Sequence, residues 1–90
     1  MKRIEIIFSQ TLEEDILSAL SKVPEAQFYT IIPEVWGKGY STPKMGSPVW
    51  PETNEIMIIY CDDDVEPKIT GPVKELQAKY TREGLAYFVI

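Results

Sequence analysis

This sequence has no histidine, a single cysteine and no long apolar run, and each of these features argues against a class of protein. Without histidine, the chain has no Ser-His-Asp or Cys-His catalytic arrangement and no histidine-rich metal site. Cys61 has no partner for an internal disulfide, which favours a reducing compartment, so we expect a cytoplasmic protein. No apolar run approaches the roughly 18 residues of a membrane helix, and direct membrane insertion is not expected.

Few basic residues are present. The chain of 90 residues has 9 basic and 14 acidic side chains and a net charge of −5, which disfavours nucleic-acid binding. A hydrophobic content of 44% predicts a globular chain, and residues 1–90 are expected to form one domain with a thin core. No nucleophile is paired with a base, and no carboxylate pair lies in an apolar setting. We therefore expect a binding protein and not an enzyme.

The apolar periodicity alternates between that of strands and that of helices. The predicted strands are 2–8, 27–36, 55–61 and 85–90, and the predicted helices are 11–23 and 62–83. The order βαββαβ predicts an α+β, ferredoxin-like fold, in which a four-stranded antiparallel sheet carries both helices on one face.

Several local signals refine these boundaries. Thr11 and Glu14 have the spacing of a capping box at the start of the first helix, and Pro24 is expected to end that helix. Pro33 predicts that its strand lies at the sheet edge or contains a bulge. Pro72 is expected to kink or restart the second helix.

The sheet face away from the helices should be polar in a monomer. Instead, the strands at 27–36, 55–61 and 85–90 are apolar on both faces. So large an apolar surface predicts that another subunit covers it. The alternative is that the long loop after the second strand folds back over the sheet, with Trp50 as the plug.

That loop, residues 37–51, holds three of the five glycines, three of the seven prolines, two lysines and no acid. Glycine lets backbone N–H groups approach a ligand closely, and lysine adds a positive charge, so Gly37, Lys38 and Gly39 favour an anionic ligand. The alternative is a flexible connection with solubilising lysines. Trp36 and Trp50 bracket the loop and either stack on a base or anchor an interface, and anchoring is favoured.

Asp62, Asp63 and Asp64 with Glu66 offer oxygen ligands for a divalent cation, but acids at a helix start are ordinarily capping residues, which is the favoured interpretation. Cys61 ends an apolar strand and is expected to be a buried structural thiol. We predict no metal site.

Four segments resemble the PII (GlnB-like) signalling superfamily. Residues 2–7 resemble its opening strand, and residues 34–39 (Glu-Val-Trp-Gly-Lys-Gly) resemble the E-V-x-G-x-G start of its T-loop. Residues 61–66 (Cys-Asp-Asp-Asp-Val-Glu) resemble A-D-D-x-V-E at the start of the second helix. Residues 81–84 resemble the turn before the last strand. The flexible T-loop-like segment would then cover 37–54.

This resemblance implies a homotrimer with an effector site in the clefts between subunits, where a small anionic ligand, an adenine nucleotide in true PII proteins, is bound. It also implies that the 37–51 loop regulates a membrane transporter or an enzyme. The expected ligand-binding residues are Gly37, Lys38, Gly39, Tyr40, Lys44 and Arg82, the last reaching the ligand from a neighbouring subunit.

The short turn at 81–84 and a chain that stops at Ile90 favour the divergent PII-like proteins over those that control nitrogen metabolism. The main alternative is a CutA-like trimer that binds a divalent metal through Cys61 and residues 62–64. A third class is a small dimeric enzyme of the ferredoxin-like isomerase or monooxygenase type.

Overall fold

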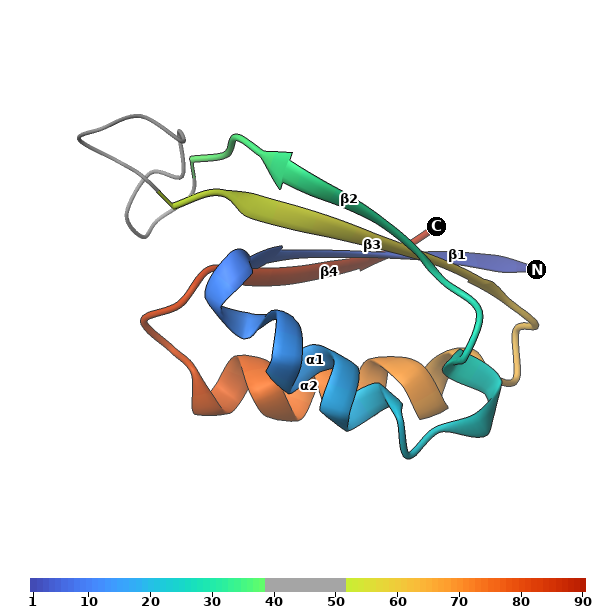
Figure 1. Cartoon of the computed structure of the whole chain (residues 1–90). Helices are drawn as coiled ribbons and strands as arrows, with labels where there is room; N and C mark the ends of the chain where they lie inside the picture. Colours follow the sequence, from blue (N-terminus) through green and yellow to red (C-terminus); the bar gives the residue numbers. More distant parts are fainter. Residues whose placement is uncertain (39–51) are drawn as a thin grey trace.

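The computed structural model of the chain describes residues 1–38 and 52–90 (Figure 1). Its strands are β1 (Lys2–Ser9), β2 (Thr30–Val35), β3 (Asn54–Cys61) and β4 (Leu85–Val89). Its helices are α1 (Glu13–Leu20) and α2 (Glu66–Lys79), with 3-10 turns η1 (Gln10–Leu12) and η2 (Pro24–Ala26). The strand order is β2-β3-β1-β4, and all neighbours are antiparallel. Both helices lie on one face of the sheet in Figure 1, so the predicted ferredoxin-like α+β fold is confirmed.

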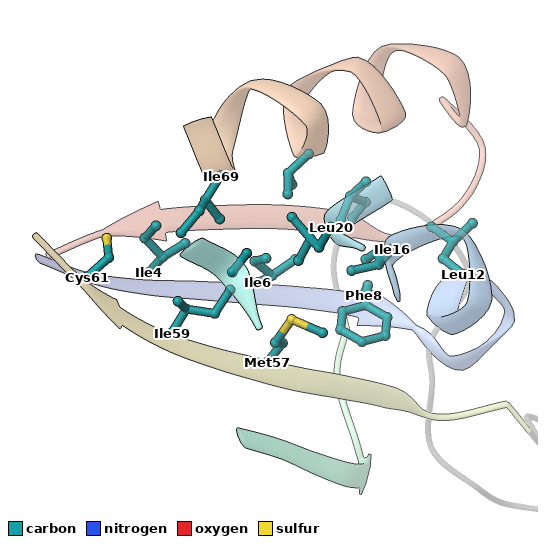
Figure 2. Close-up of a cluster of buried hydrophobic side chains, with 13 residues drawn as sticks. Ile4, Ile6, Phe8, Leu12, Ile16, Leu20, Met57, Ile59, Cys61 and Ile69 are labelled. Carbon is teal, nitrogen blue, oxygen red and sulfur yellow. The ribbon is translucent and has the colours of Figure 1, made fainter. Parts of the chain in front are cut away.

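The core fills the space between the sheet and the two helices (Figure 2). Alternation along β1 sends Ile4, Ile6 and Phe8 toward the helices, and all three are fully buried. They meet apolar residues of β3 and of both helices, which are Met57, Ile59, Ile16, Leu20, Ile69 and Val73. Each such side chain contributes roughly 1.5–3 kcal/mol by leaving water, so these contacts hold the helices on the sheet.

Strand β2 lies at the edge of the sheet and has an irregular register between Ile32 and Val35. Both features predicted from Pro33 are therefore present. Within the irregular stretch, Glu34 has a positive φ of 55°, an uncommon conformation for a residue other than glycine. The strand starts later than predicted because the Gln27 side-chain amide donates to the carbonyls of Leu20 and Val23.

The predicted helix caps are wrong. Thr11 does not cap α1, because its hydroxyl donates to Glu83 at 3.0 Å. Leu12 stands at the N-cap with no side-chain cap bond, and α1 ends at Leu20, before Pro24. The acids at 62–64 precede α2 in a turn, and Val65 occupies its N-cap, also without a side-chain cap bond.

The predicted restart at Pro72 is also wrong, because α2 is continuous from Glu66 to Lys79. Ile69 and Val73 lie on either side of Pro72, and both are fully buried. Their packing against the sheet holds the two halves of the helix in one element.

Candidate functional site

Residues 39–51 are flanked by the ends of β2 and β3, and the connection from α2 to β4 lies at the same end of the sheet (Figure 1). Asn54 pairs with Ser9 of β1 on one side and with Val35 of β2 on the other. The Ser9 N–H donates to the carbonyl of Gly84 at 2.8 Å. The candidate site therefore spans the end of all four strands.

Gly37 leaves β2 immediately beside Asn54. A Cβ atom at Gly37 would stand 2.5 Å from Nδ2 of Asn54. Any residue other than glycine would have to displace the Asn54 amide, whose Oδ1 is buried and without a hydrogen-bond partner. The glycine expected at the start of the loop thus packs closely against the side chain of the residue that begins β3.

The predicted ligand residues fall on two sides of the sheet. Gly37 and the exposed Lys38 follow β2 at one edge, whereas the exposed Arg82 precedes β4 at the other. Strands β3 and β1 lie between them, so one subunit does not bring Arg82 to Gly37. The remaining predicted residues, Gly39, Tyr40 and Lys44, lie outside the described residues.

Sequence reasoning missed a polar cluster here, consisting of Ser9, Gln10, Thr11, Thr53 and Glu83. The Thr53 hydroxyl donates to Gln10 Oε1 at 2.7 Å, and the Gln10 N–H donates to the Thr53 carbonyl at 3.0 Å. The hydroxyls of Ser9 and Thr11 lie 3.0 Å apart, and Thr11 also bonds Glu83. Turn η1 is thereby tied both to the segment before β3 and to the turn before β4. Three consecutive polar residues at 9–11, at the end of a mainly apolar strand, could have predicted this cluster from the sequence.

Glu55 is a buried carboxyl group one residue further along β3. Its side chain is 8% exposed, and Oε1 has no hydrogen-bond partner. It lies opposite Phe8 in the register and therefore on the helix side of the sheet. Burial raises the pKa of Glu55, and the nearby carboxylate of Glu13 raises it further.

We expect Glu55→Gln to stabilise the protein by about 1 kcal/mol at neutral and alkaline pH, because the amide avoids the burial of a charged group whose Oε1 has no hydrogen-bond partner. A folded-state pKa above the unfolded value means that stability is fully present below the unfolded pKa and falls as pH rises through the folded pKa. The advantage of Glu55→Gln should therefore shrink on acidification. Urea unfolding at several pH values measures it.

Glu75→Gln is the matched control, since Glu75 is exposed on α2 and its substitution should leave the free energy of unfolding nearly unchanged. A Glu55→Gln variant less stable than the parent at alkaline pH would show that the carboxylate is stabilised by a partner.

The residues needed for a CutA-like metal site do not converge within the described chain. Cys61 is buried, and burial together with nearby carboxylates raises its thiol pKa, as expected of a structural thiol. Asp63 pairs with the N-terminal ammonium at 3.0 Å. Among residues 1–38 and 52–90, no three His, Cys, Asp or Glu side chains gather as a metal site. A pocket of about 270 Å³ beside Cys61 lies at the other end of β3 from Asn54.

The sheet face away from the helices is open and largely apolar, as predicted. Register places Ile58 opposite Glu5 and Ile56 opposite Ile7 on this face. Its exposed apolar side chains include Tyr60 (58%) and Phe88 (52%). This open face is built from all four strands. Its residues are Arg3, Glu5, Ile7, Thr30, Ile32, Ile56, Ile58, Tyr60, Ala86, Phe88 and Ile90.

One ion pair, between Arg3 and Glu5, interrupts the open face. The Arg3 guanidinium bonds Glu5 Oε2 at 2.9 Å and the Tyr60 hydroxyl at 2.9 Å, with its Cζ 5.6 Å from the centre of the Tyr60 ring. The charges are thus matched and hydrogen-bonded within one subunit, which is the condition for covering them without a large penalty.

Comparison with known proteins agrees with this fold. The family model described as nitrogen regulatory protein P-II matches residues 1–90. The chain belongs to the P-II family. P-II proteins are signalling regulators and not enzymes, so the expected resemblance and the expected regulatory class are both confirmed. No curated protein sequence matches the chain. No helix among the described residues is long and apolar enough to span a membrane.

Solved structures of P-II-like proteins share the fold. CPII from Thiomonas intermedia K12, bound to ADP and bicarbonate, is 21% identical with a TM-score of 0.72, covering 99% of this chain and 82% of CPII. Its apo form is 17% identical with a TM-score of 0.68, covering 99% and 85%. A Thermus thermophilus protein described as PII-like is 19% identical with a TM-score of 0.63, covering 99% and 82%. CPII has also been solved with ADP, AMP and acetate.

Proposed function

We propose that this P-II family protein is a homotrimer that senses a small anionic effector, an adenine nucleotide being the first candidate, in the clefts between subunits. The effector controls a transporter or an enzyme through the loop at 37–51. The open apolar face carries the proposal, because a soluble monomer rarely exposes such a surface and a second subunit would cover it. The reduced Cys61 fits action in the cytoplasm.

Gly37, Lys38, Gly39, Tyr40 and Lys44 are proposed to contact the effector from one subunit. Arg82 is proposed to reach it from the next subunit, since Gly37 and Arg82 stand at opposite sides of one sheet. A threefold arrangement allows one subunit's β2 edge to approach its neighbour's β4 edge. Such a cleft would combine close backbone approach at Gly37 with the positive charges of Lys38 and Arg82.

The test is calorimetric titration with ADP and AMP, combined with thermal unfolding. A ligand at 100 times its Kd should stabilise the folded protein by about 2.7 kcal/mol. Gly37→Val is expected to abolish binding, because its side chain must displace Asn54. Gly71→Val is the matched control, since a Cβ there meets nothing within 4 Å, and it should retain binding.

Light scattering on the same samples separates loss of the site from loss of the assembly. Gly37→Val should keep the mass of a trimer. A trimer that binds neither ADP nor AMP would contradict the proposal that the effector is an adenine nucleotide, but not the proposed trimer. A wild-type monomer would contradict the assembly itself.

A further inference from the structure

Glu55 is a buried carboxyl group that the proposed effector site does not use. Its side chain is 8% exposed, and Oε1 has no hydrogen-bond partner among the described residues. Its register partner on β1 is Phe8, which is fully buried and lies with Leu12 at the end of the core away from Cys61 (Figure 2). A carboxylate in such surroundings loses hydration without gaining a counter-charge, so its ionisation responds strongly to other charges nearby.

The titratable groups that face Glu55 from the elements around it are acidic. The carboxylate of Glu13, at the start of α1, disfavours ionisation of Glu55. Strand β2 places Glu34 of its bulge in the stretch opposite Glu55, and β1 presents the apolar Phe8. In the part of the chain that the structure describes, no lysine or arginine forms an ion pair with Glu55. Its negative charge is therefore not compensated within one subunit.

Glu55 also follows directly after the residue that packs against the start of the loop. The side chain of Asn54 lies against Gly37, and Asn54 pairs with Val35 at the end of β2. The exposed Lys38 comes next in the chain after Gly37. An anion bound at Gly37 and Lys38 would therefore lie at the same end of β3 as the buried carboxyl group.

Two negative charges at this end of the sheet influence each other. Burial lowers the effective dielectric constant around Glu55 and keeps counter-ions away from it, so screening is weaker than between two exposed groups. The arrival of an anion therefore favours the neutral acid over the carboxylate. The carboxylate takes up one proton from the solvent and becomes a carboxylic acid. This effect needs no contact with the effector, which agrees with the buried position of Oε1.

We propose that Glu55 couples effector binding to proton uptake, so that the protein binds its anionic effector more tightly as the pH falls. This proposal rests on the proposed function and adds the proton concentration as a second input to the same site. Glu55 is better suited to this coupling than its acidic neighbours, because Glu34 is exposed and Glu13 is partly exposed, and water screens their charges.

The sign of the pH dependence follows from linkage. Burial and Glu13 already raise the pKa of Glu55 in the protein without effector, and a bound anion would raise this pKa further. A proton is taken up on binding at pH values between the two pKa values, and none is taken up well above or well below both. Within that window, the association constant should fall by up to about tenfold for each unit by which the pH rises.

Calorimetric titration with ADP measures the coupling. Titrations at one pH in buffers with different ionisation enthalpies report how many protons are taken up for each ADP bound. The parent protein should take up more protons than Glu55→Gln between about pH 5 and 8, and Glu55→Gln should bind ADP up to about tenfold more tightly than the parent at the alkaline end. Protonation of ADP itself enters both titrations and cancels in the difference. Glu75→Gln, exposed on α2, is the matched control and should behave as the parent does.

The carbon-13 resonance of the Glu55 carboxyl group provides a second readout in the unmodified protein. Its titration midpoint should move to higher pH when ADP saturates the site. Equal proton uptake by the parent and Glu55→Gln, or an unmoved midpoint with ADP bound, would overturn the coupling and leave the proposed function intact. Absence of ADP binding to the parent at every pH would overturn the nucleotide effector and the coupling together.

Discussion

Ile58→Glu is expected to convert the proposed trimer into a folded monomer. Ile58 lies on the open face between its two register partners, Glu5 of β1 and Thr30 of β2. A carboxylate there would be desolvated by the next subunit and repelled by Glu5. Burying an unpaired charge costs several kcal/mol, which is enough to dissociate a trimer at micromolar concentration.

Light scattering measures this change as a fall from three times the 10.3 kDa chain mass to a single chain mass. Ala78→Glu is the matched control, because Ala78 is exposed on α2 and the substitution adds the same charge away from the open face. A trimer that persists in Ile58→Glu would show that the open face is not the subunit interface.

Arg3→Met is expected to destabilise the assembled protein by about 3–5 kcal/mol, the usual cost of leaving one partner of a buried ion pair alone. The Arg3–Glu5 pair is only partly covered in a single chain, with side-chain exposures of 38% and 26%. An exposed ion pair contributes about 0–1 kcal/mol, so the size of the effect reports whether a neighbour covers the pair.

Double substitution provides the control. Arg3→Met combined with Glu5→Leu removes both charges and should recover most of the lost stability, since apolar replacement of a buried pair is often neutral. Chemical denaturation of all variants at one protein concentration yields the coupling energy. Additive losses, or a loss for Arg3→Met within the range of an exposed pair, would contradict burial of this pair.

The fold was predictable because its main determinants are periodic. Strand alternation placed Ile4, Ile6 and Phe8 on one face, and these residues are the buried centre of the sheet. The order of elements then left few topologies open. Pro33 was also informative, because a residue without a backbone N–H is tolerated in a sheet only at an edge strand or a bulge.

The helix starts were not predictable, because capping depends on contacts with residues far along the chain. Thr11 has the sequence context of a cap, yet its hydroxyl bonds Glu83, 72 positions later. Asp63 likewise bonds the N-terminal ammonium. A polar side chain near a helix start takes whichever donor or acceptor the tertiary fold brings closest.

The candidate site was only partly predictable, because it too depends on contacts between residues that are far apart in the sequence. The sequence identified Gly37 only as one of several glycines in the loop. Its close approach to Asn54 depends on the pairing of β2 with β3, which brings the two residues together. Burial of Glu55 follows from a register that no local pattern reveals. Arg82 was expected at the site only from the family resemblance, and within one subunit it lies at the opposite side of the sheet.

Through the polar cluster, turn η1 links two segments that are distant in the sequence, the one before β3 and the one before β4. Gln10 accepts a hydrogen bond from Thr53, which lies just before β3, and Thr11 donates one to Glu83 in the turn before β4. Residues 9–11 thus form a continuous hydrogen-bonded connection between Thr53 and Glu83. A displacement of the chain that enters β3 would therefore also move the turn that precedes the edge strand β4.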